Sequence, residues 1–101
     1  MTYSKDQIIA GLTEYAQKSG AKHWSEWYVG ISKDARNRMF NEHSVKESGD
    51  WWIFRQATSS SVAREVESHF VNTLGADGGT GGGDHTADMV YAYMKGRHTN
   101  P

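Results

Sequence analysis

The chain has 101 residues, a formal net charge of −1 and no cysteine. A length near 100 residues fits one domain, and the missing cysteines exclude disulfides, thiolate metal sites and a cysteine nucleophile. Proteins that hold long duplexes usually carry a basic excess, because phosphate neutralisation dominates their affinity. A contact with nucleic acid is therefore expected to be local.

The first residues carry no apolar segment of the kind that opens a signal peptide, and no apolar run approaches the about 18 residues of a membrane span. The sequence thus predicts a soluble, cytoplasmic protein without a membrane partner.

Hydrophobic periodicity and capping residues predict six elements. In chain order they are a helix over residues 4–19, a strand over 23–32, a helix over 34–43, a strand over 51–55, a helix over 60–74 and a strand over 89–94. This α-β-α-β-α-β order predicts an α+β fold in which helices pack on a small three-stranded sheet. Periodicity leaves open whether that sheet is antiparallel or mixed.

One carboxylate stands on the apolar side of the predicted helix over residues 60–74. At about 100° per residue, Glu67 falls inside the arc of four apolar side chains, those of Ala63, Val66, Phe70 and Leu74. A buried carboxylate needs an ion pair, hydrogen bonds or a metal, because an isolated buried charge is costly. The sequence leaves open an ion pair with Arg38, Arg55 or Arg64, an edge position that reaches solvent, and a functional role.

Three side chains near the predicted helix over residues 34–43 are further candidates. Arg38 can pair a phosphate bidentately, or it can pair with Asp34 one helical turn earlier. Tyr28 is either a packing aromatic or a phenol that orients water. His43, on the flank of the same helix, is either a packing residue or a base.

Other segments are candidates for ligand contacts. Lys33, Arg36 and Arg38 form the densest basic cluster. Trp51 and Trp52 place one indole on each face of their strand, and one of them is a candidate platform for stacking a base. The glycine run over residues 75–83 lacks the Gly-Lys-Ser/Thr of a phosphate loop and follows a helix rather than preceding one. Its glycines permit positive φ and fit a tight return to the last strand or a backbone nest for an anion.

From residue 27 to about residue 74 the chain resembles the GIY-YIG nuclease superfamily. The second motif of that family has Tyr-Ile-Gly, then a small or hydroxyl residue, an acidic or amide residue, and an arginine eight positions after the glycine. It is matched by Tyr28-Val29-Gly30, Ser32, Asp34 and Arg38. His43 lies one place later than the histidine that often follows this arginine. The helix in which Ala63 precedes Glu67 by four residues is similar to the helix that bears the family's metal-binding glutamate.

The resemblance implies a single GIY-YIG-like domain over residues 1–101 that acts as a metal-dependent phosphodiesterase on nucleic acid. It implies that Glu67 holds Mg²⁺ or Mn²⁺, that Arg38 steadies the phosphate, and that Tyr28 helps to position the nucleophilic water. His43 completes the expected catalytic set. The expected ligand-binding residues are Lys33, Arg36, Trp52, Gly79, Gly81, Tyr91 and Tyr93.

The chain departs from the family at the first motif. No Gly-Ile-Tyr strand precedes Tyr28, since that region has the pattern of a helix. One hypothesis is that the last strand takes the place of the missing one beside residues 24–31, with Tyr91 or Tyr93 supplying the lost tyrosine.

Two other functions remain open at this stage. The first is a non-catalytic GIY-YIG-like module that binds or sequesters a nucleotide-derived ligand. The near-neutral charge, the absence of the first motif and the aromatic content favour it. The second is a protein-interaction role, possible as a homo-oligomer, in which exposed tryptophans form an interface.

Overall fold

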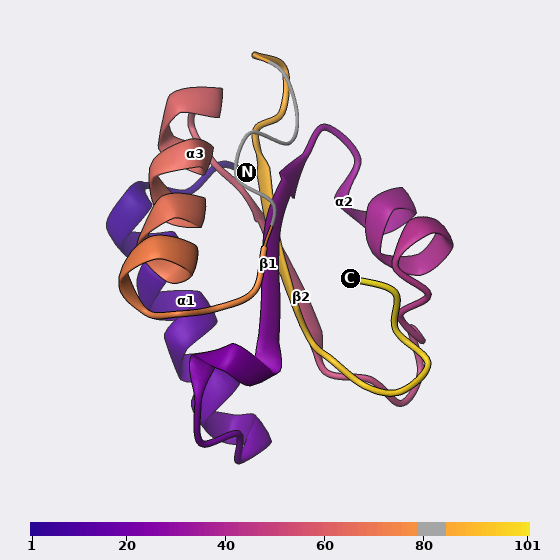
Figure 1. The fold of residues 1–101 in the computed structure, drawn as a ribbon. Helices are drawn as coiled ribbons and strands as arrows, with labels where there is room; N and C mark the ends of the chain where they lie inside the picture. The colour runs from indigo at the N-terminus through magenta and orange to yellow at the C-terminus, as the bar shows by residue number, and fades with distance from the viewer. Residues whose placement is uncertain (79–84) are drawn as a thin grey trace.

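The computed structural model describes residues 1–78 and 85–101 (Figure 1). The helices are α1 (Lys5–Ser19), α2 (Ala35–Asn37) and α3 (Ser60–Ser68), and the strands are β1 (Trp27–Ser32), β2 (Trp52–Gln56) and β3 (Met89–Met94). Their order along the chain is the predicted one, and the α+β class is confirmed.

Local side-chain chemistry fixes where the two longer helices begin. The Ser4 hydroxyl accepts a hydrogen bond from the Gln7 backbone N–H at 3.2 Å, and the Gln7 side chain accepts one from the Ser4 N–H at 2.9 Å. This reciprocal capping box starts α1, and Gly20, with φ of 80°, ends it. Ser59 caps α3 by accepting from the Val62 N–H at 3.1 Å.

Three elements differ from their predictions in helix type or in where they begin. The predicted helices over residues 34–43 and 60–74 each change into a wider π turn, at Arg38–Glu42 and His69–Thr73. The predicted strand over residues 23–32 begins only at Trp27, because Trp24–Glu26 form a 3₁₀ turn. The Glu26 carboxylate holds that turn by accepting from the backbone N–H groups of Lys22 and His23 at 2.8 and 2.9 Å.

The sheet has the strand order β1-β3-β2, and β3 pairs antiparallel with both neighbours. The last strand is therefore the central one. Tyr93 lies opposite Tyr28 in the register, and Tyr91 lies opposite Gly30. The hypothesis that the last strand lies beside residues 24–31 is confirmed for the part that forms a strand, Trp27–Ser32, and the sheet is antiparallel.

Helices cover both faces of this sheet, with α1 and α3 on one side and α2 on the other (Figure 1). Because side chains alternate along a strand, each strand contributes to two cores. The core toward α1 and α3 includes Ile8, Leu12, Trp27, Val29, Ile31, Val66, Phe70, Val90 and Ala92, and the core toward α2 contains Ala35, Met39, Val45, Tyr91 and Tyr93. The buried aromatic side chains on the α2 side are thus the tyrosines Tyr91 and Tyr93, whereas Trp27 and Phe70 lie on the other side.

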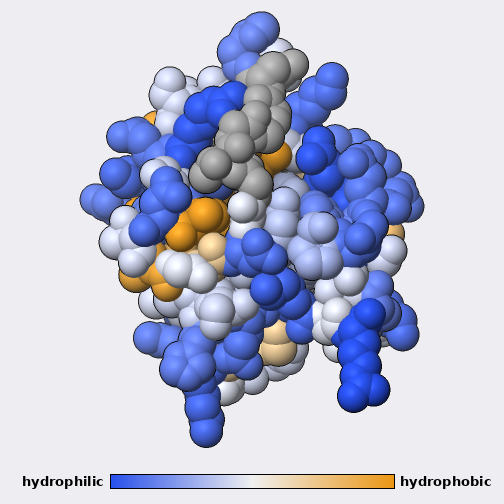
Figure 2. Space-filling model, viewed as in Figure 1, coloured by the Kyte–Doolittle hydropathy of each residue, from blue (hydrophilic) through white to orange (hydrophobic). Residues whose placement is uncertain are grey.

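Within the described residues, no helix combines the length and the apolar character needed to cross a membrane. In the view of Figure 1, the surface over α2 is hydrophilic, and hydrophobic atoms gather on the side of α1 and α3 (Figure 2).

Candidate functional site

Three tyrosines from the two paired strands form the centre of the α2 face. Tyr28, Tyr91 and Tyr93 occupy alternate positions and therefore project to the same side. The Tyr28 ring stacks on Tyr93 with centroids 5.3 Å apart and on Tyr91 with centroids 6.2 Å apart. Tyr91 and Tyr93 are buried, whereas Tyr28 is half-buried.

His43 joins the tyrosines from the end of the π turn after α2. Its ring centroid lies 4.7 Å from that of Tyr28. Its Nε2 lies 2.9 Å from the Tyr91 hydroxyl, and its Nδ1 lies 2.8 Å from the backbone oxygen of Asn100. The histidine is buried and hydrogen-bonded at both nitrogens, so the structure holds it in one ring orientation.

Gly30 makes room for the Tyr91 hydroxyl. A Cβ atom at position 30 would lie 2.5 Å from that hydroxyl oxygen, which is closer than real side chains approach. The glycine of the Tyr28-Val29-Gly30 motif is therefore required by the close approach of Tyr91 rather than by its own backbone angles.

Arg38 stands at the start of the π turn, and its side chain is about one-third exposed. Its Nε lies 3.4 Å from the Glu42 Oε1, outside hydrogen-bond geometry, and has no hydrogen-bond partner among the described residues. The alternative pairing with Asp34 is wrong, because the Asp34 carboxylate instead accepts from the Asn37 N–H at 3.1 Å and caps α2. Arg38 also lines a hollow of about 200 Å³ with Ser32, Lys33, Asp34, Asn37, Glu42 and Ala87.

Glu67 lies on the buried side of α3, as the helical arc predicts, and is only 4% exposed. The alternative of a solvent-reaching edge position is therefore wrong. Its Oε2 has no hydrogen-bond partner among the described residues. Burial raises the pKa of this carboxyl to about 7, and the positive charge of Arg64 opposes that rise. Of the three candidate arginines, Arg64 is the one whose charge acts on Glu67.

Tyr91 hydrogen-bonds to His43, and charges from both helix layers act on the pKa of its phenol. Burial raises the pKa of its phenol above the ordinary value, the neighbouring Tyr28 and the Glu67 charge raise that pKa further, and the Arg38 charge lowers it. The Tyr91 phenol thus lies in the electrostatic field of both Arg38 and Glu67, although α2 and α3 cover opposite faces of the sheet. Burial, followed by Tyr28 and Asp77, likewise raises the pKa of Tyr93.

Asp77 and Asn100 reach this region without being predicted from the sequence. Asp77 pairs with the outer edge of β1 through two backbone hydrogen bonds, to Val29 at 2.9 Å and Trp27 at 2.8 Å. The only sequence signal for Asp77 is its position just after a helix-ending glycine. Asn100 carries no signal at all, since it lies 57 positions from His43.

Two of the predicted ligand-binding residues make structural contacts. Arg36 pairs with Glu47 at 2.7 Å, and its guanidinium lies over the rings of Phe40 and Trp52 at 5.1 and 5.6 Å. The Trp52 indole N–H donates to the Glu47 backbone oxygen at 3.0 Å. Lys33 is exposed beside the Arg38 hollow, and Gly79 and Gly81 lie outside the described residues.

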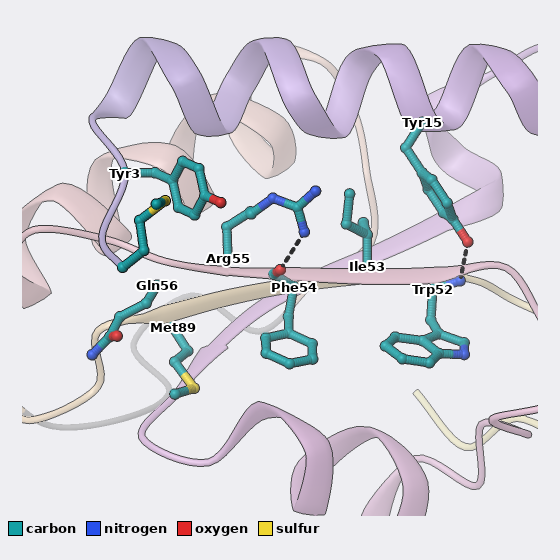
Figure 3. Close-up of a pocket in the computed structure, with 9 residues that line it drawn as sticks. Tyr3, Tyr15, Trp52, Ile53, Phe54, Arg55, Gln56 and Met89 are labelled. Carbon is teal, nitrogen blue, oxygen red and sulfur yellow. Dashed lines mark hydrogen bonds between the residues drawn. The ribbon is translucent and has the colours of Figure 1, made fainter.

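Trp52 also lines a hollow of about 500 Å³ along the outer edge of β2. Figure 3 shows Trp52, Phe54 and Met89 on one side of the strand and Tyr3, Tyr15 and Arg55 on the other. The Tyr15 hydroxyl accepts from the Trp52 backbone N–H at 3.0 Å, and the Arg55 guanidinium donates to the Phe54 oxygen at 2.8 Å (Figure 3). Backbone groups at this edge of β2 are therefore hydrogen-bonded by the chain's own side chains.

The donor set limits which metal could bind. Among residues 1–78 and 85–101, no group of three or more His, Cys, Asp or Glu side chains is placed to hold a metal ion. Mg²⁺ requires only one or two carboxylates when water and substrate phosphate complete its six ligands. The Oε2 of Glu67 has no hydrogen-bond partner among the described residues, but it is buried, so a hydrated ion would bind only if this carboxylate became accessible.

In comparisons with protein-family models, curated proteins and solved structures, nothing matched this chain.

Proposed function

We propose that this chain is a small metal-dependent phosphodiesterase of GIY-YIG type that cleaves nucleic acid. The observation that carries the proposal is the Tyr91 hydroxyl, which lies 2.9 Å from His43 Nε2 and whose pKa is affected by the charges of Arg38 and Glu67. All three of these residues belong to the set that the resemblance implies. Arg38 and His43 stand at the two ends of one π turn, and Glu67 lies on α3.

The pairing of β3 with β1 supports a rearranged version of the family's sheet. Under the proposal, β3 takes the place of the strand that carries the missing first motif. Tyr93 then supplies the lost tyrosine, because it lies opposite Tyr28 in the register and stacks on it. Tyr91 occupies the position opposite Gly30 and holds His43.

The chemistry assigned to the site is hydrolysis of a phosphodiester. Oxygen from water bonds to phosphorus, one bridging P–O bond breaks, and the products are a phosphomonoester and an alcohol. The Arg38 guanidinium, which is about one-third exposed and lines the hollow of about 200 Å³, would bind a phosphate oxygen and offset its charge. Tyr28, the half-buried phenol, would orient the water. A Mg²⁺ or Mn²⁺ ion held by Glu67 would supply Lewis-acid stabilisation of the phosphate.

The proposal is tested by cleavage of labelled single-stranded, duplex and branched DNA and RNA with Mg²⁺ or Mn²⁺. Glu67→Gln, which keeps the side-chain shape, should reduce cleavage at least about 100-fold. Glu65→Gln is the matched control, because Glu65 is an exposed carboxylate on the same helix. Cleavage that survives in Glu67→Gln, or that needs no divalent ion, would contradict the proposal.

A second candidate is the non-catalytic module that binds a nucleotide-derived ligand. It is favoured by one observation: Glu67, His43, Tyr91 and Tyr93 are each less than a tenth exposed. On this alternative, the anionic ligand would bind in the hollow beside Arg38. Calorimetric titration with mononucleotides and dinucleotides separates the two functions, since the module would bind without metal and cut nothing.

A further inference from the structure

The segment that follows β3, residues 95–101, packs back onto the site. In Figure 1 the end of the chain lies between the sheet and α2. The Lys95 N–H donates to the Glu26 oxygen at 2.8 Å, and Thr99 closes a turn on Gly96 through hydrogen bonds of 2.8 and 2.9 Å. His98 pairs with Asp50 at 2.5 Å. These contacts fix the path of the segment on both sides of its turn.

The segment ends on His43 with two hydrogen bonds that involve only its backbone. The Asn100 N–H donates to the His43 backbone oxygen at 2.7 Å. The Asn100 backbone oxygen lies 2.8 Å from His43 Nδ1. A carbonyl oxygen can only accept, so Nδ1 must be the nitrogen that carries a proton.

We infer that the backbone carbonyl of Asn100 selects the Nδ1–H form of neutral His43. The Tyr91 hydroxyl must then donate its hydrogen bond to His43 Nε2. In that form Nε2 is an acceptor, and the Tyr91 O–H at 2.9 Å is its donor. Residue 100 is therefore a positioning residue that acts through His43.

This tautomer sets what Tyr91 offers to other groups. The single hydroxyl proton of Tyr91 is donated to His43 Nε2, so the phenol oxygen can only accept hydrogen bonds from other groups. As a base the pair would work in sequence, since Tyr91 oxygen takes a proton from water while its own proton passes to Nε2. The imidazolium that forms keeps its Nδ1–H on the Asn100 oxygen and returns the extra proton to the leaving alkoxide. This catalytic consequence rests on the proposed function, whereas the tautomer does not.

The experiment is ¹⁵N NMR of the histidine side chains, because protonated and bare imidazole nitrogens have widely separated shifts. In the full chain near pH 8, His43 should carry its proton on Nδ1, with Nε2 bare. A variant lacking residues 100 and 101 should lose that preference and populate the Nε2–H form. Asn100→Ala is the matched control, since it keeps the backbone carbonyl, and it should give the same shifts as the unaltered chain.

A proton on Nε2 in the full chain would overturn the inference without any variant, as would an unchanged tautomer in a folded chain that lacks residues 100 and 101. Backbone amide spectra establish whether that variant is folded. If the full chain cleaves nucleic acid, the shortened variant should lose about 100-fold in kcat with little change in KM. Absence of cleavage in the full chain counts against the proposed function alone, because the tautomer is measured without substrate.

Discussion

Glu67 is the residue at which stability and the proposed chemistry oppose each other. A carboxyl whose pKa rises on folding from 4.5 to about 7 binds more protons in the folded state. Its contribution to the free energy of unfolding is full below about pH 4.5 and is lost as pH rises through about 7. The folded protein therefore carries the cost of an ionised, buried carboxylate at pH 8.

Replacing that carboxyl should relieve the cost only where it is ionised. We predict that Glu67→Gln raises the free energy of unfolding by up to about 3 kcal/mol at pH 8 and changes it little at pH 5. Urea unfolding at the two pH values measures this difference. The exposed Glu65→Gln should show no such pH dependence, and an equal effect of Glu67→Gln at both values would contradict the prediction.

The identity of Gly30 is dictated by a neighbouring side chain, that of Tyr91. We predict that Gly30→Ala destabilises the protein by about 1–3 kcal/mol, because the added methyl group would displace the Tyr91 hydroxyl from His43. Thermal unfolding measures the loss. Gly11→Ala is the control, since a Cβ there meets nothing within 4 Å, and in helix α1 it should stabilise by up to about 1 kcal/mol. Equal effects at both glycines would refute the close-approach argument.

At the scale of the elements, the serine run at the start of α3 shows how the structure selects one N-cap among three candidates. Ser59, Ser60 and Ser61 are all capping residues by type, yet only Ser59 has the extended backbone and accepts from the Val62 N–H. This hydrogen bond places the first residue of α3 at Ser60, whereas the burial of Glu67 follows from its position within the apolar arc of the helix.

Ser59→Ala is predicted to lower the free energy of unfolding by about 1 kcal/mol, the usual cost of a lost N-cap. Chemical denaturation provides the value. Ser61→Ala, an exposed position inside α3, serves as the comparison and should be close to neutral. If the two substitutions cost the same, the helix does not begin where the hydrogen bond places it.

At the scale of the whole molecule, the last strand holds the sheet together. β1 and β2 make no pair with each other in the sheet order, and each is hydrogen-bonded to β3. A chain ending at residue 88 would leave both remaining strands without a partner strand and expose the two cores that β3 separates.

We therefore predict that a chain of residues 1–88 is unfolded, whereas a chain of residues 1–95, which retains all three strands, folds. Circular dichroism and amide proton dispersion distinguish the two states. A cooperative unfolding transition in the shorter chain would contradict the central role of β3. The chain of residues 1–95 also lacks Asn100, so a folded result shows that the contact with His43 is separable from folding.

The sequence by itself determined the features that are local in origin. The capping box at Ser4, the stop at Gly20 and the side of the helix that Glu67 occupies follow from spacing along the chain, because these interactions span one helical turn. The α-β-α-β-α-β order follows for the same reason. The resemblance added the expectation that Tyr28, Arg38, His43 and Glu67 act together, which stays a prediction.

Only the tertiary structure decided what depends on contacts between distant residues. Three such contacts join positions that are tens of residues apart: the pairing of β3 at the centre of the sheet, the close approach of the Tyr91 side chain to Gly30, and the contact of Asn100 with His43. No short-range pattern encodes them, because they arise from the packing of two helix layers on a shared sheet. The π turn that ends at His43 belongs to the same class, since the sequence carries no local signal for it and His43 contacts the distant residues Tyr91 and Asn100.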